Sequence, residues 1–156
     1  MFLALYVISL QQVVGPSMEK NLYSGDVLLL DRLTYKISSI KRNDVAAVYY
    51  EKDSKYLIKR IIGLPGDVVY FKDGKLYIND LLTAEPYLGK DVITPDWDLG
   101  VINQTVIPKD MYLTVGDNRT NSLDSRDPRV GLISKKDILG KVRLRIWPLN
   151  KLKIVK

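Results

Sequence analysis

The sequence predicts an all-β fold with very little helix. Short runs rich in β-branched and aromatic residues recur along the chain, and turn residues separate them. Several runs alternate apolar with polar residues, which is typical of strands with one buried face. The 156 residues are enough for one domain with a sizeable core, and 46% of them are hydrophobic.

Six segments carry the strand signal. Strands are expected at 26–37, 44–50, 56–63, 111–117 and 141–149, and a hairpin at 67–80 that turns at Asp73-Gly74. In 141–149, Val142, Leu144 and Ile146 alternate with Lys141, Arg143 and Arg145, which predicts one apolar and one cationic face.

The remaining segments are less regular. Residues 134–140 could form one short helical turn, with Ser134 as its N-cap and Gly140 as its C-cap. Residues 81–108 are rich in Pro and Asp and indicate an extended connection. We expect a single domain over 14–156, with a β-rich insertion around 66–110.

The N-terminal segment 1–13 is apolar from Phe2 to Leu10 but too short to cross a bilayer by itself, which takes about 20 residues. It has neither the positive start nor the small-residue cleavage site of a signal peptide. Two interpretations stay open: the end of a membrane anchor whose start is absent, or an ordinary first strand. We favour an anchor that continues into a strand.

Charge is concentrated at the other end of the chain. The net charge is +6, and residues 135–156 hold eight basic side chains against the single acid Asp137. Such a segment could bind anionic lipid or nucleic acid, or it could be a solvated basic edge.

The chain contains no Cys and no His. A Ser-His-Asp triad, a Cys-His pair and a zinc site built on these residues are therefore excluded. If the protein is a hydrolase, its base must be Lys, Asp, Glu or Tyr.

Three stretches could carry chemistry. Gly15-Pro16 forces a turn that could present Ser17 as a nucleophile, although this triplet is common in loops. Lys59 lies in the apolar run "LIKRIIG", where burial would lower its pKa and make it a general base; by itself, a lysine that reaches water is the commoner outcome. Residues 116–129 interleave Arg with Asp, which could rigidify a site.

These stretches together resemble a known family. "GPSM", "YLIKRIIGLPGD", "LYIND…EPYL" and "GDNRTNSLDSRDPRVGLI" occur in that order. They resemble the bacterial type I signal peptidases, the Ser-Lys leader peptidases, over roughly residues 13–148. The compact length is similar to the Gram-positive form, and the family implies the signal-peptidase and SOS-repressor type of β-fold, with mixed, mostly antiparallel sheets and very little helix.

The resemblance implies roles for individual residues. Ser17 matches the nucleophile, Lys59 the general base, and Ser122 a hydroxyl that hydrogen-bonds the base. Gly15 stands where some members carry an oxyanion-hole Ser, so the hole would depend on the backbone N–H of Ser17. The structural network of the site would comprise Arg60, Asp117, Asn118, Asp124 and Arg126, with Arg60 paired to Asp117 or Asp124. The substrate pocket would include Met18, Leu57 and Ile58.

The implied protein is a membrane-associated serine endopeptidase that removes signal peptides from secreted preproteins. It would act on the outer face of the cytoplasmic membrane, as a monomer in contact with lipid, with no metal, cofactor or nucleic acid. Two alternatives remain: a non-catalytic or dedicated relative that assists assembly of secreted or pilus-type subunits, and a self-cleaving repressor-type Ser-Lys protease.

One position departs from the family pattern. The family usually continues Ser-Met-x-Pro-Thr, whereas this chain has Lys20-Asn21 in place of Pro-Thr. The loss of Pro removes a fixed φ, and Asn21 is expected to make a Thr-like hydrogen bond to the turn.

Overall fold

The computed structural model describes residues 7–156 and consists mainly of strands. The strands are β1 (Ile8–Gln12), β2 (Val27–Asp31), β3 (Val45–Tyr50), β4 (Lys55–Gly63), β5 (Val69–Lys72), β6 (Lys75–Ile78), β7 (Leu81–Thr83), β8 (Trp97–Asp98), β9 (Met111–Val115), β10 (Ile133–Ser134), β11 (Ile138–Trp147) and β12 (Lys153–Ile154). Helical turns are α2 (Thr34–Ile37) and the 3-10 turns Glu51–Asp53, Leu99–Ile102, Lys135–Asp137 and Leu149–Lys151.

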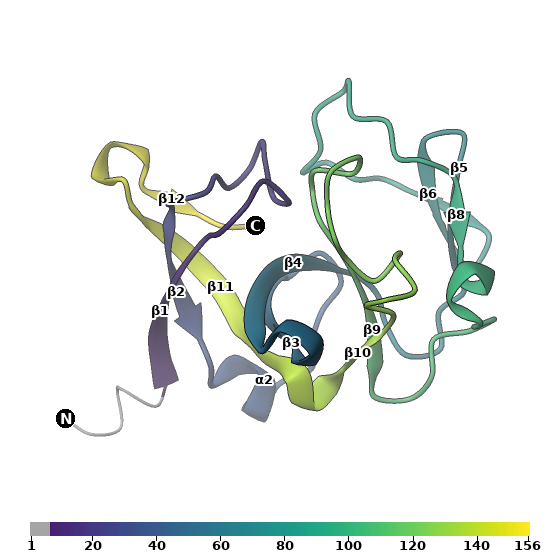
Figure 1. Cartoon of the computed structure of the whole chain (residues 1–156), viewed down its shortest axis with the longest axis horizontal. Coiled ribbons are helices and arrows are strands. Elements are labelled where there is room, and N and C mark those ends of the chain that lie inside the picture. The colour runs from purple at the N-terminus through teal and green to yellow at the C-terminus, as the bar shows by residue number, and fades with distance from the viewer. Residues whose placement is uncertain (1–6) are drawn as a thin grey trace.

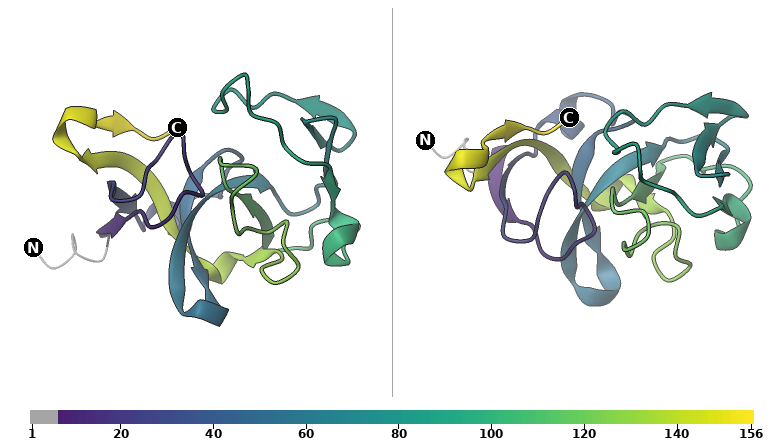
Figure 2. Two further views of the ribbon diagram at one scale, coloured as in Figure 1. Left: turned by 45° about the horizontal axis from the view of Figure 1, so that its top comes forward. Right: turned by 90° about the horizontal axis from the view of Figure 1, so that it is seen from above.

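The strands form two sheets. The larger has the order β1-β2-β11-β3-β4-β9-β10, with β12 added to β11, and the smaller has the order β7-β6-β5-β8. Every pairing among the described residues is antiparallel. In all three views the smaller sheet and the β1–β12 region lie at opposite ends of the molecule (Figure 1, Figure 2). The predicted all-β class is confirmed, and the smaller sheet is built from residues inside the predicted insertion.

Strand β4 is the centre of the packing. It pairs with β3 on one edge, and its residues Ile58, Ile61 and Ile62 each belong to a different buried apolar cluster. Lys59 and Arg60 therefore sit where three apolar clusters meet, and both are almost fully buried.

The hairpin predicted to turn at Asp73-Gly74 is confirmed. Strands β5 and β6 are joined by Asp73 and Gly74, both with positive φ, as the short turns that suit hairpin twist require. The apolar run at 26–37 is shorter than predicted as a strand. It ends at Asp31, whose carboxylate accepts the N–H groups of Leu33 and Thr34 and starts the turn into α2.

The predicted helical turn at 134–140 is wrong beyond Asp137. Gly140 lies inside strand β11, where a Cβ would stand 2.7 Å from the Asp31 carbonyl oxygen. This glycine permits close approach of two strands and does not cap a helix.

The two predicted faces of β11 are also wrong beyond Val142. Register shifts after Val142 and Arg145 reverse the alternation, so that Leu144 is 37% exposed and Arg145 only 7%. The cations of this strand each meet one acid: Lys141 with Asp44, Arg143 with Asp31, and Arg145 with Asp26. Each of these three cations therefore has an acidic partner within the fold.

The N-terminal segment is described only in part. Residues 8–12 form β1, which pairs with β2, so this portion is a strand; residues 1–6 lie outside the described residues. Within residues 7–156, no helix is both long and apolar enough to cross a membrane.

Candidate active site

The nucleophile candidate Ser17 lies on a tight turn that follows β1. Gly15 adopts a φ of +84°, which favours glycine, and Pro16 accepts a hydrogen bond from the N–H of Glu19. Asn118 supports this turn from the loop after β9. Its backbone N–H donates to the Ser17 carbonyl at 3.0 Å, and its Nδ2 donates to the Pro16 carbonyl at 3.1 Å.

Lys59 reaches this turn from β4. Its Nζ lies 2.6 Å from Ser17 Oγ, although 42 positions separate the two residues in the chain. The side chain is 2% exposed, and this burial lowers its pKa from the usual 10.5 to about 8, against the opposing attraction of Asp124. A lysine with this pKa can change its protonation state near neutral pH.

Arg60 points away from Lys59 and pairs with Asp117. Its Nε and Nη2 bind the two carboxylate oxygens at 2.8 and 2.7 Å, and both side chains are 1% exposed. Its Nη1 donates to the carbonyls of Asn43 and Lys156. Of the two partners that the sequence allows, Asp117 is therefore the one found, and this pair ties β4 to the loop after β9.

Asp124 serves a second pair within the same loop. It binds Arg126 through two hydrogen bonds at 2.9 and 2.8 Å and accepts the backbone N–H of Gly116 at 2.9 Å. Burial by itself would raise the pKa of the Asp124 carboxyl, but Arg126, the Gly116 N–H and the Ser122 hydroxyl outweigh burial and lower it. The loop thus holds a permanent carboxylate near Lys59.

Ser122 lies beside the turn but does not bind Lys59 as predicted. By distance and angle its buried Oγ makes no hydrogen bond among residues 7–156, and Lys59 Nζ binds Ser17. The Ser122 hydroxyl nevertheless lies close enough to the Asp124 carboxylate to help lower the pKa of that carboxyl. A Cβ at Gly116 would stand 2.1 Å from Ser122 Oγ and 2.5 Å from the Ser17 carbonyl oxygen. Only glycine at 116 leaves room for both serines.

The three residues predicted to line the substrate pocket expose little of their surface. Met18 is fully buried and Ile58 nearly so, both in the apolar cluster beneath the turn, and Leu57 is half-buried. Their role in binding a substrate stays a prediction.

The predicted hydrogen bond from Asn21 to its own turn is not formed. The side-chain Nδ2 of Asn21 donates instead to Asp117 Oδ2 and to the Tyr87 carbonyl oxygen. Glu85, Tyr87 and Arg119 also belong to this network, although no sequence pattern identified them. Arg119 is fully buried and pairs with Glu85, while Tyr87 lies over the Arg60 guanidinium. Glu85 and Tyr87 lie in the "EPYL" stretch that resembles the family, but the sequence did not indicate which residues they contact.

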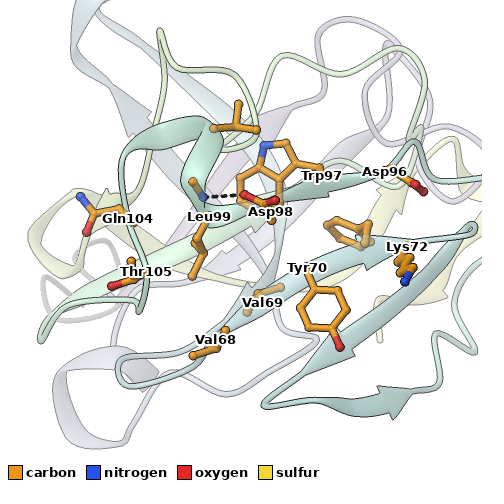
Figure 3. A pocket seen from close by; sticks show the side chains of 13 residues that line it. Val68, Val69, Tyr70, Lys72, Asp96, Trp97, Asp98, Leu99, Gln104 and Thr105 are labelled. Carbon is orange, nitrogen blue, oxygen red and sulfur yellow. Dashed lines mark hydrogen bonds between the residues drawn. The ribbon is translucent and has the colours of Figure 1, made fainter.

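A hollow beside the smaller sheet is separate from these residues. A cavity of about 720 Å³ opens between β5 and the segment around β8, lined by Tyr70, Lys72, Trp97 and their neighbours (Figure 3). None of the predicted site residues lines it, so the catalytic candidates gather elsewhere.

Comparison with known proteins is consistent with this geometry. The protein-family model described as "Signal peptidase, peptidase S26" matches residues 1–147. A signal peptidase I P of Bacillus subtilis subsp. natto is 36% identical over 148 residues, which cover 92% of this chain and 80% of that protein. A signal peptidase IB of Staphylococcus aureus is 36% identical over 160 residues, covering 95% and 82%.

A solved structure is also similar. The crystal structure of a signal peptidase I from Enterococcus faecalis V583 has a TM-score of 0.59 and 31% identity, and the match covers 67% of this chain and 97% of that one.

Proposed function

Because this chain belongs to the signal peptidase family, peptidase S26, and is a serine peptidase that removes signal peptides, we propose that Ser17 and Lys59 form its catalytic dyad. The observation that carries the proposal is the 2.6 Å contact between Ser17 Oγ and the buried Lys59 Nζ. The absence of His from the sequence leaves Lys59 as the base within reach.

Lys59 can act as the base because its burial keeps a fraction of the molecules with a neutral Lys59 amine. With a pKa of about 8, about one Lys59 in ten is an amine at pH 7, whereas a lysine at 10.5 would be almost wholly charged. The amine takes the Ser17 proton as Oγ attacks the scissile carbonyl and forms an ester. The resulting ammonium protonates the departing amine, and Lys59 then activates the water that cleaves the ester.

The substrate strand has an open edge to join. Strand β9 pairs with β4 only from Arg60 onward, so residues 55–59 pair with β3 and leave their other edge free of β9. Both backbone groups of Ile61 face Asn43 and Asp44 on the β3 side. By alternation, Tyr56 and Ile58 direct theirs to the open edge, where an extended signal peptide can add as a strand.

Oxyanion stabilisation falls to the turn itself. Gly15 offers no hydroxyl, and none of the hydrogen bonds within the described residues uses the N–H of Ser17. That N–H is thus available to the developing oxyanion. Ser122, buried beside the turn and close to Asp124, is the neutral hydroxyl to which the Lys59 ammonium can donate after it leaves Ser17.

We assign contact with the membrane to the β1–β12 end. Large apolar side chains are exposed there: Leu10, Val14, Trp147, Leu149, Leu152 and Ile154. Such a patch favours insertion into the bilayer interface, with tryptophan at headgroup depth. This surface supports contact of the domain with lipid, and membership of the signal peptidase family would place the domain on the outer face of the cytoplasmic membrane, beside the signal peptides of emerging preproteins.

Cleavage of a model preprotein in lipid vesicles tests the dyad. Ser17→Ala, Lys59→Ala and Lys59→Arg should each abolish cleavage, the last because arginine does not deprotonate. Ser54→Ala, on an exposed turn, is the matched control and should cleave at the wild-type rate. An inactive wild type would favour the non-catalytic assembly role, and an active Lys59→Arg would overturn the assignment of the base.

A further inference from the structure

The turn that carries Ser17 is held at both ends by one short loop. Asn118 binds the carbonyls of Pro16 and Ser17 at the start of the turn. At its end, Asn21 Nδ2 donates to Asp117 Oδ2 at 2.7 Å. The consecutive residues 117 and 118 therefore clamp the nucleophile turn from both sides.

The Asn21 amide uses both of its hydrogens. Besides Asp117 Oδ2, Nδ2 donates to the Tyr87 carbonyl oxygen at 2.8 Å. Both partners are acceptors, so the amide group has one orientation that satisfies the pair. A hydroxyl side chain, with a single hydrogen, could satisfy only one of them.

Both acceptors are fixed independently of Asn21. Asp117 is locked by its two hydrogen bonds to Arg60. The Tyr87 ring lies 3.9 Å from the Arg60 guanidinium carbon, and its hydroxyl donates to Glu85 Oε1 at 2.7 Å. Glu85 in turn pairs with the buried Arg119, whose Nε donates to the Gly116 carbonyl. Asn21 thus binds the turn to a rigid frame.

We propose that Asn21 is a positioning residue: its two hydrogen bonds, to Asp117 and to the Tyr87 carbonyl, hold the turn where Ser17 Oγ meets Lys59 Nζ. The inference rests on the proposed Ser17–Lys59 dyad. It also explains how the turn keeps its shape with Lys20 in place of a φ-restricting proline, because two hydrogen bonds replace one fixed dihedral.

Loss of the Asn21 hydrogen bonds should slow the chemical step without weakening substrate binding. The open edge of β4 at residues 56–58 binds the substrate backbone, and Asn21 does not lie on that strand. A displacement of the nucleophile of about 1 Å can cost about a hundredfold in rate. Loss of both Asn21 hydrogen bonds should therefore lower kcat while leaving KM near the wild-type value.

Steady-state cleavage of a signal-peptide substrate by three variants tests the proposal. Asn21→Thr keeps one donor and should lower kcat about tenfold, Asn21→Ala about a hundredfold, and Asn21→Asp more, because its carboxylate meets Asp117 and a carbonyl. Asn150→Ala, the same change at an exposed site, should match wild type.

Thermal unfolding of each variant separates positioning from loss of fold. If Asn21→Ala does not fold, the Thr variant decides: a kcat equal to wild type overturns the proposal. Equal kcat across the series, or a change confined to KM, overturns it as well. Failure of the dyad itself is distinguished by Ser17→Ala, whose residual activity would refute the proposed function whatever the Asn21 series does.

Discussion

Replacement of Lys59 by methionine should inactivate the protein and also make the fold more stable at neutral pH. The Lys59 ammonium is buried where three apolar clusters meet, and burial lowers its pKa from 10.5 to about 8. A shift of this size corresponds to about 3 kcal/mol of destabilisation of the charged form in the fold. Methionine has a similar length and no charge, and loss of the bond to Ser17 offsets about 1 kcal/mol. We expect a net gain of about 2 kcal/mol.

The pH dependence of the free energy of unfolding shows why Lys59→Met should be the more stable protein. Below pH 8, Lys59 is charged in both the folded and unfolded states, so the full cost of burial is present. Between pH 8 and 10.5 the unfolded state still binds the proton while the folded state has released it, and wild-type stability therefore rises with pH. The advantage of Lys59→Met should accordingly be largest at pH 6–7 and shrink as the pH rises through 8 toward 10.5.

Urea unfolding of both proteins at several pH values measures this difference. Lys75→Met, on the exposed side of β6, is the control and should change the free energy of unfolding by less than about 0.5 kcal/mol. Two outcomes would refute this reasoning: Lys59→Met being less stable than wild type at pH 7, or its gain in stability not depending on pH. In either case burial would not lower the pKa of Lys59, and nothing would explain how this lysine acts as a base.

Two further predictions follow from the same site. With a Lys59 pKa of about 8, kcat/KM for a fluorogenic signal peptide should rise about fiftyfold between pH 6 and 8 and then flatten, and a flat profile would contradict general-base catalysis by Lys59. Gly116→Ala should lower the cleavage rate more than about a hundredfold, because its Cβ would overlap Ser122 Oγ and the Ser17 carbonyl; Gly89→Ala, whose nearest neighbour would lie at 3.9 Å, is the control, and equal rates would refute the crowding.

Local features of the sequence predicted local structure well. The Asp73-Gly74 hairpin forms because its turn residues accept positive φ, and the apolar run around Lys59 forms β4 because consecutive apolar residues reach clusters on both faces. Predictions failed where distant residues intervene. The faces of β11 reverse at register shifts against β2, and Gly140 is needed for contact with Asp31 and not as a helix cap.

In the candidate site, too, some features follow from the sequence and others only from the tertiary structure. The sequence by itself determined which chemistry is available: a serine on a Gly-Pro turn, a lysine in an apolar strand, and no histidine or cysteine. The tertiary structure alone decided which side chains meet: Lys59 with Ser17, Arg60 with Asp117 instead of Asp124, and Asn21 with Tyr87. Residue types set what a side chain can donate or accept, but partners tens of positions apart are selected by strand register and burial, which no local pattern encodes.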